Sequence, residues 1–126
     1  MMNKYETLTW ENYYLSKIRF SNRCGNHYNC IRVFKNNKYI HERVKFDIAF
    51  KLIREGFTVM TEAIFEESGR ADVLAIKGKH AYIIEIETSK SKSLMKKKIL
   101  EKQKYPKDFE LIIINAENFD INKWDL

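Results

Sequence analysis

The sequence feature that most constrains the fold is a pair of apolar runs separated by a short turn. Residues 69–76 and 81–89 are runs of strand length rich in valine, isoleucine and alanine, and Lys77-Gly78-Lys79-His80 separates them. A glycine between two such runs is typical of a β-hairpin. The sequence therefore predicts two adjacent antiparallel strands over residues 69–89.

Three acidic residues interrupt this hairpin. Side chains alternate between the faces of a strand, so Glu85 and Glu87 project from the face of Ala81 and Ile83, about 6–7 Å apart. Asp72 lies near the start of the first strand and comes level with Glu85 in an antiparallel pair. Clustered carboxylates on a partly buried sheet are costly unless a cation neutralises them or one binds a proton. The pattern predicts a site for a hard divalent metal.

The composition is that of one globular domain. The chain has 126 residues, of which 44% are hydrophobic and 13% aromatic, and its single proline and four glycines argue against disorder. No run of 18 apolar residues exists, and residues 1–6 lack the apolar core of a signal peptide. We therefore expect a cytoplasmic protein with no membrane partner. Two cysteines are too few for a disulfide scaffold.

The net charge of +6 is unevenly distributed. Residues 1–40 carry +5 and residues 90–107 hold eight lysines and one acid, whereas residues 41–89 carry −2 and residues 108–126 carry −4. Basic segments on either side of an acidic centre suit an enzyme that acts on a polyanion. The alternative for residues 90–107 is a lysine-rich helix that is merely solvated.

The first 40 residues give the weakest patterns. Residues 14–20 alternate as a strand would, although a helix over residues 10–18 competes with it. Residues 31–34 and 39–40 flank an asparagine-rich turn and predict a second hairpin. We expect residues 1–40 to form a basic, hairpin-like extension of the core.

A possible zinc site lies in this extension. Cys24, His27 and Cys30 follow a Cys-x2-His-x2-Cys spacing, and His41 comes eleven residues later. Together they could bind zinc as four ligands, but the spacing matches none of the common zinc ribbons or fingers. Two thiols and a loop histidine are the alternative interpretation.

Residues 41–56 have helical periodicity and end at a glycine, a usual helix stop. Glu42 starts this helix on its buried side, where a favourable charge at the helix N-terminus is the simpler explanation. The apolar positions form two stripes that cover a wide arc: Val44, Ile48 and Leu52, then Phe46, Ala49, Phe50 and Ile53.

The remaining elements complete a core over residues 41–126. We expect a strand over residues 57–65, a helix over 91–105, a strand covered on both faces over 110–115 and a short helix in the tail around Phe119, Ile121 and Trp124. The predicted order is α-β-β-β-α-β, an α/β fold with a mixed central sheet.

This order of elements and its acidic residues resemble the PD-(D/E)XK nuclease superfamily, which has a restriction-endonuclease-like core. The Glu42-Arg43 pair and the spacing from Asp72 to Glu85 are similar to those of archaeal Holliday junction resolvases. His41, Lys45 and the sequence Glu85-Ile86-Glu87-Thr88-Ser89 resemble competence CoiA-like nucleases. The resemblance covers residues 41–115.

The resemblance implies a metal-dependent deoxyribonuclease that cuts phosphodiester bonds, with a structure-specific substrate as one option. The implied catalytic residues are Glu42, Asp72, Glu85 and Glu87. Asp72 and Glu85 would bind Mg²⁺ or Mn²⁺, with Glu42 and Glu87 completing the site or binding a second ion. The implied DNA contacts are Arg43, Arg70, Lys90, Lys92, Lys96, Lys97 and Lys98. Cleavage of both strands would require a homodimer.

Glu87 departs from the superfamily, which has lysine two positions after the second acid. Lys45, Lys90 or Lys92 could supply the missing charge. Two alternatives to the nuclease stay open: a catalytically inactive DNA-binding or assembly protein on the same fold, and a zinc-stabilised interaction module built on residues 24–41.

Overall fold

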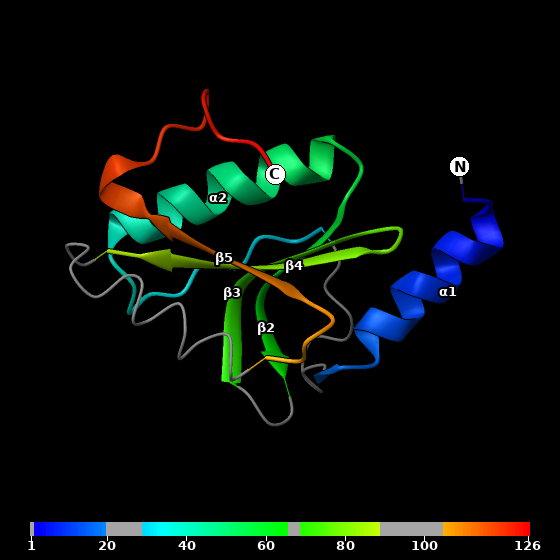
Figure 1. Ribbon diagram of the computed structural model, residues 1–126. Helices are drawn as coiled ribbons and strands as arrows, with labels where there is room; N and C mark the ends of the chain where they lie inside the picture. The colour runs from blue at the N-terminus through cyan, green and yellow to red at the C-terminus, as the bar shows by residue number, and fades with distance from the viewer. Residues whose placement is uncertain (1, 20–28, 66–68, 89–104) are drawn as a thin grey trace.

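The chain forms an α/β fold around a five-stranded mixed sheet (Figure 1). The structure, a computed structural model, describes residues 2–19, 29–65, 69–88 and 105–126. Strands β1 to β4 pair antiparallel in chain order, and β5 pairs parallel to β4, so the prediction of a mixed sheet is confirmed. The strands are β1 (Ile18–Arg19), β2 (Thr58–Phe65), β3 (Gly69–Lys77), β4 (His80–Glu87) and β5 (Glu110–Asn115).

The predicted hairpin is formed by β3 and β4. Their pairing runs from Lys77 opposite His80 to Val73 opposite Ile84. The ladder ends there; carried one residue further, the same register would place Asp72 opposite Glu85, which agrees with the prediction that the two acids lie level with each other.

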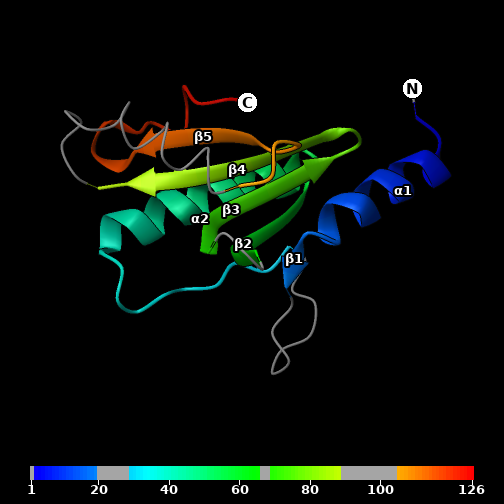
Figure 2. The same cartoon turned by 60° about the horizontal axis from the view of Figure 1, so that its bottom comes forward.

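Helix α2 (Tyr39–Arg54) covers one face of the sheet (Figure 2). Its buried residues Val44, Ile48 and Leu52 pack with Val59 and Ile84 of the sheet in one core cluster. The second predicted stripe is partly wrong. Two of its members, Phe46 and Phe50, are each 49% exposed and stack on each other along the outside of the helix.

The opposite face of the sheet packs against α1 (Lys4–Leu15) and the segment before β5. The strand predicted over residues 14–20 is wrong except at β1, and the competing helix is right in type but starts earlier. At the start of α1 the Glu6 N–H donates to Asn3 Oδ1 and the Asn3 side-chain amide donates to Glu6 Oε1, so Asn3 caps the first turn of the helix. Tyr14, Leu15 and Ile18 are buried in this second cluster, so the basic N-terminal segment contributes to the core.

The hairpin predicted over residues 31–40 is not formed. Residues 35–37 make the expected turn, but Tyr39 begins α2 instead of a second strand. The amide of Asn37 donates to Glu42 Oε1 at 2.6 Å, which ties the turn to the first turn of the helix. Before the turn, Cys30 forms an isolated parallel β-bridge with Met60 of β2.

Strand β5 contacts both core clusters, as its continuous apolar sequence predicted: Leu111 and Ile113 lie on one side, and Ile112 and Ile114 on the other. The chain then forms a 3₁₀ turn, η2 (Ala116–Asn118), in place of the short helix expected further on. The helix predicted over residues 91–105 lies outside the described residues, apart from its last position. Neither α1 nor α2 has the length and apolar character to cross a membrane.

Gly56 ends α2 in a left-handed conformation, with φ +93°. A side chain at this φ is strained, although the nearest atom that an added Cβ would meet, Lys77 Nζ, is 3.7 Å away. We expect Gly56→Ala to lower the free energy of unfolding by about 1 kcal/mol. Urea denaturation measures this change. Glu55→Ala, one residue earlier in a right-handed conformation, is the control and should change it by less than about 0.5 kcal/mol.

Candidate functional site

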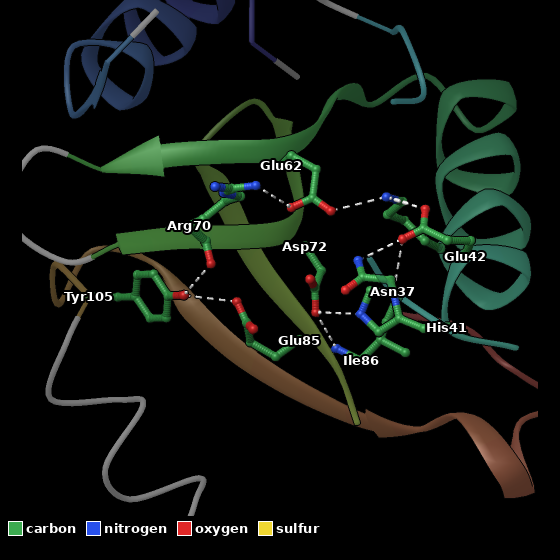
Figure 3. Close-up of polar contacts among 10 residues, drawn as sticks. Asn37, His41, Glu42, Glu62, Arg70, Asp72, Glu85, Ile86 and Tyr105 are labelled. Atoms are coloured by element: carbon green, nitrogen blue, oxygen red, sulfur yellow. Dashed lines mark hydrogen bonds and ion pairs between the residues drawn. The ribbon is translucent and has the colours of Figure 1, made fainter. Parts of the chain in front are cut away.

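Strands β3 and β4 stop pairing where the acidic residues begin. The last partners of the ladder are Val73 and Ile84, and beyond them the Ile86 N–H donates to Asp72 Oδ2 at 2.8 Å (Figure 3). A side-chain carboxylate therefore binds an amide of β4 close to where a regular ladder would have used a backbone carbonyl. Asp72 thus lies in the gap between the two strands.

The regular alternation of side chains between the two faces of the sheet is also interrupted at this level. Met60 and Ala63 of β2 belong to the same core cluster although they are three residues apart, and so do Leu74 and Ala71 of β3. Glu62, between the first two, has φ +53°, a left-handed conformation that is uncommon outside glycine. Such a residue stores about 1–3 kcal/mol of strain and often marks a functional site.

Helix α2 places a fully buried lysine, Lys45, beside this irregular part of the sheet. The Nζ atom of Lys45 lies 2.5 Å from Glu42 Oε2 and 3.0 Å from Glu62 Oε1, and the lysine side chain is 0% exposed. Both partner carboxylates are also largely buried, at 12% and 8% exposure. An isolated buried ammonium would be very costly, so the two carboxylates compensate the cost of burying the Lys45 side chain.

His41 joins Glu42 to Asp72. Its Nδ1 is 3.3 Å from Glu42 Oε1, and its Nε2 is 3.3 Å from Asp72 Oδ2. Burial alone would lower the pKa of His41, but the hydrogen bond and charge of Asp72 and the charge of Glu42 outweigh it and raise this pKa above 6.5. Since both ring nitrogens face carboxylates, the imidazolium, which donates from both, suits the position.

Glu42 is held in its ionised form. Burial would raise its pKa, but hydrogen bonds from Lys45 and Asn37, the charge of Lys45 and a backbone hydrogen bond from Phe34 lower it below 4.5. The prediction that Glu42 starts α2 on the buried side is confirmed by its 12% exposure.

Arg70 extends this network of charged side chains from Glu62 to the protein surface. Its guanidinium lies 4.0 Å from Glu62 Oε2 and stacks 4.7 Å above the ring of Phe34. These three residues line an open cavity of about 270 Å³ together with Arg32. Two arginines beside one largely neutralised carboxylate make the cavity suitable for an anion.

Glu85 lies on the face of the sheet opposite α2. The hydroxyl of Tyr105 is 2.8 Å from Glu85 Oε1 and 3.2 Å from the Arg70 carbonyl oxygen. Ala81 and Ile83 belong to the same core cluster as Tyr105, which agrees with the predicted facing of Glu85. Figure 3 shows Asp72 between the His41 side of the network and the Glu85 side.

The structure therefore joins some predicted site residues and leaves others apart. Glu42 and Asp72 meet through His41, Glu85 contacts Tyr105, and Glu87 is the last residue of β4. Within residues 2–19, 29–65, 69–88 and 105–126, no three histidine, cysteine or acidic side chains are grouped so as to hold one metal ion. The four-carboxylate metal site stays a prediction.

The other predicted contacts are partly outside the described residues. Arg43 is exposed on α2. Of the zinc candidates, Cys30 is free and exposed, and the ring nitrogens of His41 face carboxylates. The predicted residues that the structure does not describe are Cys24, His27, Lys90, Lys92, Lys96, Lys97 and Lys98.

Sequence reasoning missed three members of the network: Asn37, Glu62 and Tyr105. The signal for Glu62 was available, because a single glutamate interrupts the apolar run of residues 57–65. No periodicity identifies Asn37 or Tyr105, whose partners are set by tertiary packing.

Comparisons of the chain with protein-family models, with curated proteins and with solved structures gave no match.

The buried ion pairs predict a strong coupling between Lys45 and Glu62. Lys45→Met leaves two buried carboxylates without their ammonium, and we expect it to cost about 3–5 kcal/mol of unfolding free energy. Adding Glu62→Gln to this variant should recover part of the loss, because one of the uncompensated charges is removed. A double-mutant cycle by urea denaturation measures the coupling. Additive single effects would show that the two charges do not interact.

The His41 cluster predicts a maximum of stability in mildly acidic solution. A raised pKa for His41 stabilises the fold fully below pH 6.5, and this contribution is lost as the pH rises through the folded-state value. A lowered pKa for Glu42 stabilises the fold above pH 4.5 and is lost on acidification. The melting temperature in EDTA should therefore peak between pH 4.5 and 6.5 and fall above it.

His41→Gln should flatten the loss of melting temperature above pH 6.5. His80→Gln is the matched control, because His80 is the first residue of β4, at the end away from the acidic residues. This variant should keep the parent's dependence of melting temperature on pH. Equal profiles for both variants would show that His41 is not the titrating group.

Proposed function

We propose that this chain is a divalent-metal-dependent deoxyribonuclease with a restriction-endonuclease-like core. The observation that carries the proposal is the gap between β3 and β4, where the Asp72 carboxylate replaces a ladder partner and α2 supplies Glu42 and His41. Buried acids in a distorted part of a sheet are costly to the fold, and such costs are concentrated at functional sites.

The donor groups suit a hard divalent cation. Glu42 and Asp72 contact the two different ring nitrogens of His41, so this part of the site accommodates a positive charge between two carboxylates. The residues that would hold Mg²⁺ or Mn²⁺ are Asp72 and Glu85, with Glu42 and Glu87 as further carboxylate donors. Because Asp72 contacts His41 on the α2 side and Glu85 contacts Tyr105 on the opposite side, a shared ion would require the two carboxylates to turn toward each other. The chemistry supplied by such an ion when bound is a lowered pKa of its water and neutralisation of charge on the phosphate.

The chain's own residues hold and orient these carboxylates. Lys45 is a positioning residue, because its fully buried ammonium pairs with Glu42 and Glu62 and has no surface at which to meet a phosphate. His41 contacts Glu42 and Asp72 with its two ring nitrogens, and its raised pKa favours the imidazolium, which donates to both carboxylates. Lys90 and Lys92 remain the candidates to supply the positive charge of the superfamily's lysine, whose position Glu87 occupies in this chain.

Basic residues would hold the DNA strands. Arg70 and Arg32 line the open cavity beside Glu62, where a phosphate could bind. Exposed Arg43 and the lysines of residues 90–107, among them Lys90, Lys92 and Lys96–Lys98, would add contacts that position DNA without reading its sequence. A homodimer would place two such sites on the two strands of a duplex or junction.

The alternative function is a DNA-binding or assembly protein that keeps the fold without cleavage. Lys45 and Arg70 already neutralise Glu42 and Glu62 from within the chain, and this internal neutralisation favours the alternative. Such a protein would bind DNA but would not cut it with any divalent metal.

Cleavage of linear, nicked, flapped and four-way DNAs, with Mg²⁺ or Mn²⁺, tests the proposal. We expect the parent to cut at least one of these DNAs, and Asp72→Asn and Glu85→Gln to retain the fold and DNA binding but to cut about 10²-fold more slowly or worse. Glu87→Gln should lose a similar factor if Glu87 binds the metal or accepts a proton from the attacking water.

Glu110→Gln is the matched control, because Glu110 is an exposed acid on the neighbouring strand β5. It should cut at the parent's rate. Cleavage by Asp72→Asn at the parent's rate would refute the proposed site. Binding of the four-way DNA without cleavage in either metal would favour the alternative function.

A further inference from the structure

A second cavity lies at the far end of the β3–β4 hairpin from Asp72. Its volume is about 420 Å³, and its walls are Thr9, Trp10, Tyr13 and Tyr14 of α1 together with Asp108. Three aromatic side chains spaced along one helix thus surround a single space, which the proposed metal site does not use.

The three rings are held in fixed orientations. Trp10 and Tyr14 stack at a centroid distance of 5.9 Å and an interplanar angle of 29°, and Tyr13 stands nearly perpendicular to Trp10 at 85°. The hydroxyl of Tyr13 donates to Asp108, and that of Tyr14 donates to the Lys79 carbonyl oxygen. Rigid aromatic walls lose little conformational entropy when a flat ligand binds.

The charges at the rim indicate the chemistry of the ligand. Lys79 Nζ lies 5.9 Å from the centroid of Trp10, and Lys17 Nζ lies 5.1 Å from that of Tyr13. Because two of the three rings, Trp10 and Tyr13, already have an ammonium group over them, a cationic ligand would be repelled. A flat neutral group attached to an anion would gain stacking from the rings and attraction from both lysines.

We propose that this cavity binds an unpaired nucleobase of single-stranded DNA, with Lys17 and Lys79 contacting the adjacent phosphates. The inference rests on the proposed function for the choice of DNA as substrate, and it adds a single-stranded segment to that substrate. The position of Lys79 at the hairpin turn, seven residues from Asp72, places the bound base about 20 Å from the candidate site.

Asp108 gives the cavity a preference among bases. A carboxylate only accepts hydrogen bonds, and it can accept further ones beside the bond from Tyr13. Cytosine offers an amino group where thymine offers a carbonyl oxygen. We therefore expect tighter binding of oligodeoxycytidylate than of oligodeoxythymidylate, and Asp108→Asn should reduce that difference.

The test measures binding of fluorescently labelled (dC)₁₂ by anisotropy, in EDTA so that no cleavage occurs. Trp10→Leu keeps an apolar side chain but removes the stacking surface, and we expect it to weaken binding about 5- to 150-fold. Tyr5→Leu is the matched control, because Tyr5 lies on the same helix, is 82% exposed and does not line the cavity. It should bind as the parent does.

A second measurement avoids any loss of fold at position 10. Trp10 and Trp124 are the two tryptophans of the chain, so Trp124→Phe leaves Trp10 as the sole reporter. Its fluorescence should be quenched to saturation by (dC)₁₂. Unchanged fluorescence with bound oligonucleotide would overturn the inference, as would quenching by tetramethylammonium and not by the oligonucleotide.

The two proposals fail in distinguishable ways. Binding in EDTA that depends on Trp10, without cleavage in metal, would sustain the base site and refute the nuclease. Cleavage in metal with oligonucleotide binding that is indifferent to Trp10→Leu would sustain the nuclease and refute the base site.

Discussion

The candidate site depends on the buried charge of Lys45. Removing an ammonium group from water costs several kcal/mol, and the two carboxylates of Glu42 and Glu62 offset that cost. Glu42 comes from the same helix, whereas Glu62 comes from β2. The ion pair therefore holds α2 and the sheet at one relative position, because any shift along the helix would leave a charge without its partner. Apolar packing alone tolerates such shifts more readily.

The irregular backbone of the sheet follows from the same pair of charges. In a regular strand, Glu62 would share the face of Met60 and point away from α2. Its left-handed conformation lets the carboxylate reach Lys45 instead. Opposite it, Asp72 would share the face of Leu74 but contacts His41. The side chains of both acids therefore point to the α2 side at the same level of the sheet. The ion pairs of Glu62 offset the cost of its left-handed backbone conformation.

The sequence predicted those parts of the site that regular geometry determines. A glycine turn and two apolar runs were enough to place Asp72 level with Glu85, and helical periodicity was enough to bury Glu42. Regular geometry could not foresee the slip at Glu62, because a strand pattern assumes that alternation continues. Helix α1 was predicted only as the competing helix over residues 10–18, because its aromatic residues favour strands, and its earlier start was missed although Asn3 and Glu6 have the spacing of an N-cap and its third helical residue. The turn at residues 35–37 was recognised, but its sequence does not state whether a strand or a helix follows.

The position of the Tyr105 hydroxyl, within hydrogen-bond distance of Glu85 and of the Arg70 carbonyl oxygen, has a consequence for the lysine-rich segment before it. Tyr105 is fastened to Glu85 and to the backbone of Arg70, and Thr88 follows directly on the last residue of β4. The sixteen residues between them contain seven lysines and are tethered at both ends beside the acidic residues. Chain length alone keeps every one of these lysines within about 30 Å of an anchor. Chain connectivity alone therefore keeps seven positive charges within reach of the acidic gap.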